Sequence, residues 1–138
     1  MDFFTAMEVS ASGLAAQRVR MNVSASNLAN VETTMLADGS GPYSRKSVVV
    51  QSVPWPDPRT PGVSGVAVRQ IASDPNPPRE VYDPEHPDAD ADGYVYYPNI
   101  NPVEEMVDMI TASRAYEAGV TALSTSVSMA ERALGIGR

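Results

Sequence analysis

All twelve prolines of this chain lie between Pro42 and Pro102. Proline fixes φ and removes a backbone donor, so a long helix cannot run through this stretch, whereas the proline-free segments on either side can be helical throughout. Both of those end segments carry apolar residues at alternating steps of three and four. We therefore expect an N-terminal helix within residues 1–34, a proline-rich middle at residues 35–99 and a C-terminal helix within residues 100–138.

The apolar positions of each end form a heptad-spaced seam, typical of helices that pair along their length. The N-terminal seam comprises Phe4, Met7, Ala11, Leu14, Arg18, Met21, Ala25 and Leu28. The C-terminal seam comprises Met106, Met109, Ser113, Tyr116, Val120, Leu123, Val127, Ala130 and Leu134. Each helix is expected to be roughly 45–50 Å long, too long for a globule of 138 residues to bury. We expect the two to pack antiparallel as a coiled-coil-like pair, with the middle of the chain looped out of one end.

The middle is expected to form a small β subdomain. Runs rich in β-branched and aromatic residues predict four strands, over Ser47–Gln51, Gly65–Ile71, Arg79–Tyr82 and Tyr94–Tyr97. The linkers Val53–Pro58 and Asp74–Pro78 should be extended or turning, and their prolines should close the sheet edges. Trp55 is expected to cover the sheet rather than to anchor a partner. The predicted fold class is mainly α with a small β-rich insertion.

Charge and composition exclude several classes of protein. The net charge is −7, and residues 32–99 hold 10 acids against 5 bases. A nucleic-acid partner is not expected, because the chain offers no basic face to neutralise phosphates. Cysteine is absent, which excludes disulfides and thiolate metal sites. Neither end has an apolar run of about twenty residues, so we expect no direct membrane insertion.

The segment Asp88–Gly93 has the ligand spacing and glycine of the first half of a calcium-binding loop. The twelfth position is Asn99 instead of a bidentate glutamate. We expect a solvated acidic turn and no metal, and a calcium-binding loop module stays as an alternative function.

A second alternative is a peptidoglycan hydrolase of the cell envelope, with Glu104 and Glu105 as its two carboxylates. Neighbours on a helix point about 100° apart, which suits glycan cleavage poorly. Their place after Pro102, in the first helical turn, is explained by the helix dipole. The single histidine, His86, has no nucleophile placed beside it. We expect no catalytic residues, no enzyme activity and no cofactor.

Both helices also carry apolar residues outside the seams. These are Val9, Ala16, Val19 and Val23 near the N-terminus and Val103, Val107 and Ile110 near the C-terminus. Helices that are apolar on more than one side, in a chain too short to cover them, predict assembly with like chains. Such ends are expected to stay disordered until assembly.

The segment Ser24–Thr33 resembles the N-terminal signature of bacterial flagellar rod and hook proteins. Asn101–Ile110 and Ser113–Ala118 look like the C-terminal helix motif of the same family. The short length of the chain and the segment Ala91–Ile100 look like those of a proximal-rod subunit, since distal-rod and hook relatives have much larger middles.

This resemblance implies a structural subunit of the flagellar basal body, in the rod that crosses the periplasm. It implies export without cleavage through the flagellar type III apparatus and polymerisation through the terminal helices into a helical drive shaft that carries motor torque to hook and filament. The implied partners are other copies of the chain, proximal and distal rod subunits, and the adaptor at the export gate and MS ring.

The expected assembly interface comprises both seams without Ala130, together with Asn27, Asn30, Ile110 and Arg114. Asn27 and Asn30 either bond to neighbouring subunits or cap the end of the N-terminal helix; the sequence leaves both open. Arg18 interrupts an apolar seam, and we expect it to set register by pairing with Glu117 or Asp108 of a neighbouring helix.

Overall fold

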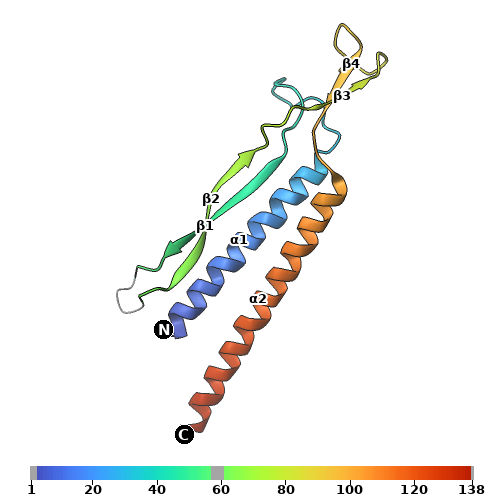
Figure 1. The fold of residues 1–138 in the computed structure, drawn as a ribbon. Coiled ribbons are helices and arrows are strands. Elements are labelled where there is room, and N and C mark those ends of the chain that lie inside the picture. Colours follow the sequence, from blue (N-terminus) through green and yellow to red (C-terminus); the bar gives the residue numbers. More distant parts are fainter. Residues whose placement is uncertain (1–2, 57–60, 138) are drawn as a thin grey trace.

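The structure is a computed structural model that describes residues 3–56 and 61–137. The elements in order are helix α1 (Phe3–Ala29), strands β1 (Lys46–Pro54), β2 (Ser64–Ser73), β3 (Arg79–Tyr82) and β4 (Tyr94–Tyr97), and helix α2 (Pro102–Ile136). Figure 1 shows α1 and α2 side by side and antiparallel, with both chain ends at the same end of the pair. This is the predicted fold class, mainly α with a β insertion.

Local chemistry accounts for the helix boundaries. Pro102 occupies the first turn of α2. Amide hydrogens in this turn have no acceptor within the helix, so a proline there costs no hydrogen bond. The side chain of Asn101 caps this turn by accepting a hydrogen bond from the Val103 amide at 3.1 Å. At the end of α1, the Asn30 amide donates to the Ser26 carbonyl at 3.1 Å, which closes the last turn.

All four predicted strands are present in the β region between the helices, and they divide into two separate sheets. β1 and β2 form one antiparallel hairpin, and β3 and β4 form a second two-stranded sheet. The hairpin runs back along α1, whereas β3 and β4 lie beyond the opposite end of the helix pair from the chain termini (Figure 1). The proline-rich segment Asp74–Pro78 separates the two sheets, because prolines cannot donate to a continuous ladder.

The other predicted linker, Val53–Pro58, is partly strand. Val53 and Pro54 end β1, and Trp55 continues towards the tip of the hairpin, while Asp57 and Pro58 lie outside the described residues. The half-buried Trp55 ring lies over Gly65 of β2, so close that a Cβ added there would be 3.4 Å from its Cζ3. Trp55 therefore covers the hairpin, as expected.

The helix seams agree only in part with the predicted ones. In α2 six of the nine predicted seam residues are protected: Met109, Ser113, Tyr116, Leu123, Val127 and Ala130. Glu105, Asp108, Ala112, Gly119 and Ser126 are protected as well. The predicted seam residues Met106, Val120 and Leu134 are 46%, 43% and 75% exposed. In α1 only Met7, Leu14, Met21 and Leu28 of the predicted seam are partly protected, whereas Phe4, Ala11, Arg18 and Ala25 are exposed.

In α2 the difference from the predicted seam follows from side-chain size. Gly119 faces Leu14, and a Cβ added at Gly119 would lie 2.6 Å from Leu14 Cδ2. Small residues recur every seven positions along α2, at Ala112, Gly119 and Ser126, and let the two helices approach closely. Ala112 is 0% exposed. The larger Met106 and Val120 are displaced outwards.

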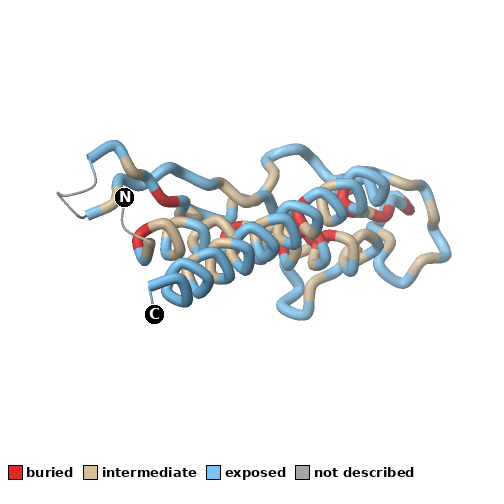
Figure 2. The backbone as a smooth tube through the Cα atoms, turned by 90° about the horizontal axis from the view of Figure 1, so that it is seen from below, coloured by how far each residue is buried: buried red, intermediate tan, exposed pale blue. Residues whose placement is uncertain are grey.

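The second apolar side of α1 is covered by the β1–β2 hairpin. Ala16 and Val23 are buried, and the Ser12 hydroxyl accepts a hydrogen bond from the Val66 amide of β2 at 3.0 Å. The corresponding side of α2 stays open, and Figure 2 shows that helix as mostly exposed towards its C-terminus. Within the described residues, the buried apolar side chains are only Ala16, Val23, Tyr43, Val95, Pro98 and Ala112. No described helix is both long and apolar enough to cross a membrane.

Candidate functional site

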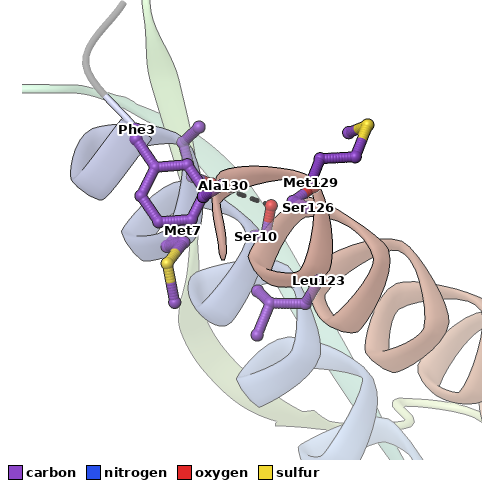
Figure 3. Close-up of a pocket in the computed structure, with 8 residues that line it drawn as sticks. Phe3, Met7, Ser10, Leu123, Ser126, Met129 and Ala130 are labelled. Atoms are coloured by element: carbon purple, nitrogen blue, oxygen red, sulfur yellow. Dashed lines mark hydrogen bonds between the residues drawn. The ribbon is translucent and has the colours of Figure 1, made fainter. Parts of the chain in front are cut away.

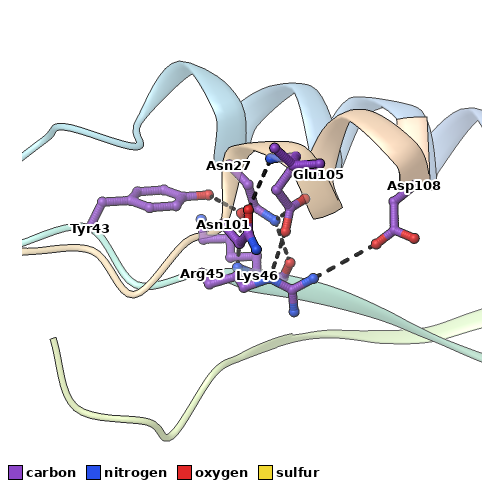
Figure 4. Close-up of polar contacts among 8 residues, drawn as sticks. Asn27, Tyr43, Arg45, Lys46, Asn101, Glu105 and Asp108 are labelled. Atoms are coloured by element: carbon purple, nitrogen blue, oxygen red, sulfur yellow. Dashed lines mark hydrogen bonds and ion pairs between the residues drawn. The ribbon is translucent and has the colours of Figure 1, made fainter. Parts of the chain in front are cut away.

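A buried polar cluster lies where α1 ends, α2 begins and β1 begins (Figure 4). Its two central side chains, Asn27 of α1 and Glu105 of α2, are each only 1% exposed. Buried polar groups are costly unless they are hydrogen-bonded, and a buried charge also requires a partner. The cluster meets both requirements with groups from the segment Tyr43–Lys46.

Asn27 pairs with the backbone of Lys46 as a neighbouring strand would. Its Nδ2 donates to the Lys46 carbonyl at 2.7 Å, and its Oδ1 accepts from the Lys46 amide at 2.9 Å. Nδ2 also donates to Glu105 Oε2 at 3.1 Å, and the Tyr43 hydroxyl donates to Oδ1 at 3.0 Å. These four bonds use both donors and both acceptor positions of the amide within one chain, and none of them caps α1. Bonding of Asn27 to a neighbouring subunit stays a prediction.

Asn30 acts locally. Its Nδ2 donates to the Ser26 carbonyl at 2.8 Å, and its Oδ1 accepts from the Thr33 hydroxyl at 3.1 Å. These bonds close the C-terminal turn of α1. Asn30 therefore caps the helix end, which is one of the two roles that the sequence left open for it.

Glu105 receives its counter-charge from Arg45. Arg45 Nε lies 2.6 Å from Glu105 Oε1, and its Nη2 lies 3.8 Å from the Asp108 carboxylate. The Arg45 side chain is 26% exposed. Sequence reasoning missed this pair, because residues 60 positions apart leave no local pattern; it assigned Glu105 to the helix dipole alone. The burial of Glu105 also contradicts the hydrolase alternative, which needs both carboxylates open to a substrate.

Arg18 is exposed at the edge of a shallow hollow that Leu14 and Tyr116 also line. Among the described residues it forms no ion pair with Asp108 or Glu117 of its own chain, since Asp108 faces Arg45 and Glu117 accepts a bond from Ser113 at 3.4 Å. Its pairing with an acid of another subunit stays a prediction.

Two apolar surfaces lie uncovered at opposite ends of the helix pair. Near the start of α2, Val103, Met106, Val107 and Ile110 are 66%, 46%, 55% and 52% exposed. Near the chain termini an open groove of about 340 Å³ lies between the helices (Figure 3). Side chains of both helices line it: Phe3, Ala6, Met7, Ser10, Leu123, Ser126, Met129 and Ala130. Both surfaces include residues of the expected interface.

The acidic loop between β3 and β4 is organised by Asp90. Its carboxylate accepts hydrogen bonds from the Tyr94 amide at 2.9 Å, the Tyr96 hydroxyl at 3.2 Å and the Asp92 amide at 3.0 Å. The Tyr94 amide bond, aided by the others, lowers the pKa of Asp90, and the same carboxylate raises the pKa of Tyr96. In the described part of the chain, no three acidic or histidine side chains are grouped to hold a metal ion. The Asp90 carboxylate thus stabilises a turn.

Paired terminal helices with uncovered apolar surfaces and a β insertion between them characterise a subunit that assembles. Residues 7–34 match the family model described as flagella basal body rod protein, and residues 91–136 match the one described as flagellar basal body rod FlgEFG protein C-terminal. The fold and these two matches define the class, that of the flagellar basal-body rod proteins.

Similarity over the whole chain narrows the class. The flagellar basal-body rod protein FlgC of Borreliella burgdorferi is 45% identical, over 99% of this chain and 98% of that protein. FlgC of Bacillus subtilis is 43% identical over the full length of both, and FlgC of Aquifex aeolicus is 48% identical over 96% of this chain and 95% of that protein. The chain belongs to the FlgC family. It is a structural subunit of the rod and is located in the flagellar basal body.

Proposed function

We propose that this chain forms part of the proximal rod, where it polymerises through its terminal helices with copies of itself and with other rod subunits. The resulting shaft crosses the periplasm and carries torque from the motor to hook and filament. The chain reaches this site through the type III export apparatus, contacts the adaptor at the export gate and MS ring, and has no enzymatic activity. The observation that carries the proposal is the uncovered apolar face at the start of α2.

This face is open to solvent in the isolated subunit. Val103, Val107 and Ile110 are each more than half exposed, and they recur along one side of α2. Fully burying each such side chain contributes about 1.5–3 kcal/mol. Contiguous exposed apolar residues on a soluble protein mark sites of association, and here the family defines the setting as the rod.

The thin core supports folding of the helix ends on assembly. The last two turns of α2 are exposed throughout their described residues, with Leu134 and Ile136 at 75% and 86%. A helix that buries so little of its own surface gains little from packing within one chain. Neighbouring subunits are expected to supply the missing contacts.

Incorporation of Val107 variants into the rod tests the proposal. A strain lacking the native gene would express the wild-type chain, Val107→Asp or the matched control Val107→Leu, and quantitative mass spectrometry of isolated hook–basal bodies would count each chain. We expect a few copies per basal body for the wild type and for Val107→Leu, but none for Val107→Asp, because a carboxylate cannot be buried in an apolar contact. Immunoblots of the culture supernatant and periplasm separate failed export from failed assembly. Normal incorporation of an exported Val107→Asp chain would contradict the proposal.

A further inference from the structure

The polar cluster joins three segments that are distant in sequence: the end of α1, the start of α2 and residues 43–46, which lead into β1 (Figure 4). We propose that this cluster is a latch. It closes only when the two terminal helices are paired, and it then holds the β1–β2 hairpin against α1. The inference concerns contacts within one chain and does not depend on the proposed place in the rod.

Asn27 connects the helix pair to the hairpin. Its two bonds to the Lys46 backbone attach the first residue of β1 to a side chain of α1. The same Nδ2 that donates to Lys46 also donates to Glu105 of α2. The amide is therefore oriented for the hairpin by a group that only the second helix supplies.

The ion pair makes α2 and the segment before β1 depend on each other. The Glu105 carboxylate is buried, and its cation, Arg45, comes from the segment that enters the hairpin. If residues 43–46 moved away, Glu105 would keep neither its cation nor the ordered Asn27 amide. If α2 moved away, Arg45 and Asn27 would both lose a partner. Each of the three segments satisfies polar groups that the other two leave open, so the contacts form together.

The hairpin needs such an attachment. An isolated two-stranded hairpin is marginally stable in water. Beyond the cluster, the side-chain hydrogen bond that ties it to α1 in the described residues is that of Ser12 to the Val66 amide. The latch lies at the base of the hairpin and this bond lies farther along it, so docking at Ser12 is a remote readout of whether the latch is closed.

A disulfide provides that readout, because the chain has no cysteine of its own. A Cβ added at Gly65 would lie 3.2 Å from Ser12 Oγ, close to the separation of about 3 Å between Cβ and the far sulfur of a disulfide. The full-length chain carrying Ser12→Cys and Gly65→Cys would be oxidised, and the rate of disulfide formation followed on non-reducing gels.

The rate is compared in three backgrounds. Glu105→Gln removes the charge, Arg45→Met with Glu105→Gln removes both charges so that none is left unpaired, and Glu104→Gln is the matched control at the exposed neighbouring residue. Far-UV circular dichroism monitors the helices in each variant. We expect disulfide formation to slow by about tenfold or more in both latch variants, on the scale of lost charged hydrogen bonds, with helix content unchanged and Glu104→Gln matching the parent.

Three results would overturn the latch. Unchanged rates in both latch variants would show that the hairpin docks without the cluster. Loss of the helices in both variants would show that the cluster stabilises the whole chain and does not control the hairpin. Absence of the disulfide in the parent would show that the hairpin does not dock against Ser12.

Discussion

Gly119 is the position at which the packing of α1 on α2 can be tested most directly. An added Cβ would lie 2.6 Å from Leu14 Cδ2 and 3.4 Å from its Cγ, whereas carbon atoms pack at about 3.5–4.0 Å. The Gly119→Leu change places three further carbons in this space. Overpacking of this kind destabilises by about 1–3 kcal/mol, and removal of a mid-helix glycine offsets about 1 kcal/mol. Because leucine belongs at the upper end of that range, we expect a net loss of about 1–2 kcal/mol in the free energy of unfolding.

The measurement is urea-induced unfolding of the full-length chain, followed by far-UV circular dichroism. Ala118→Leu is the matched control, because Ala118 is the exposed neighbour of Gly119, and we expect it to change the free energy of unfolding by less than about 0.5 kcal/mol. A size swap adds a second test. In the Gly119→Leu background, Leu14→Ala makes room for the new side chain, so the two changes should couple favourably by about 1 kcal/mol or more.

Two results together would refute the reasoning. The Gly119→Leu chain would be as stable as the wild type, and adding Leu14→Ala to it would lower its stability. The helices would then not meet at Gly119, and the predicted seam through Val120 would be restored.

Two further predictions concern single charged groups. Arg45→Met leaves Glu105 buried without its cation; such a loss destabilises by about 3–5 kcal/mol for fully buried pairs, and because Arg45 is about a quarter exposed we expect about 2–3 kcal/mol by thermal unfolding. The control Arg69→Met, at the exposed residue skipped in the β1–β2 register, should stay within about 0.5 kcal/mol, and equal effects of the two changes would argue against the ion pair. Hydrogen bonds lower the pKa of Asp90 below its ordinary value of 3.8, so its contribution to loop order is complete above pH 3.8 and is lost as the pH falls through the lower folded pKa. The NMR shift of the Tyr94 amide should report this transition, and its persistence in Asp90→Asn would assign it to another group.

The secondary structure could be predicted because its signals are local. Proline excludes helix through its own φ and missing donor, and Asn101 with Pro102 begins α2 by the same local chemistry. The β-branched run at Ser47–Gln51 marks β1 for a comparable reason. Each of these effects acts on the residue's own backbone or on a near neighbour.

The side of each helix that faces the other could not be predicted in the same way. Three of the nine predicted seam residues of α2 and four of the eight of α1 are exposed. Val120 was predicted to face α1, whereas the structure places Gly119 against Leu14. Which of two adjacent positions faces inwards depends on the shape of the other helix. A sequence pattern read one helix at a time does not contain that information.

The polar cluster was likewise predictable only in part from the sequence. Asn27 belongs to the motif shared with flagellar rod and hook proteins, so the sequence indicated that it matters, but it did not indicate its partners. The sequence by itself determined the elements, their order and the family. The tertiary structure decided that Asn27, Arg45 and Glu105 meet, because a contact between residues so far apart depends on how three separately formed segments pack and no local preference encodes it.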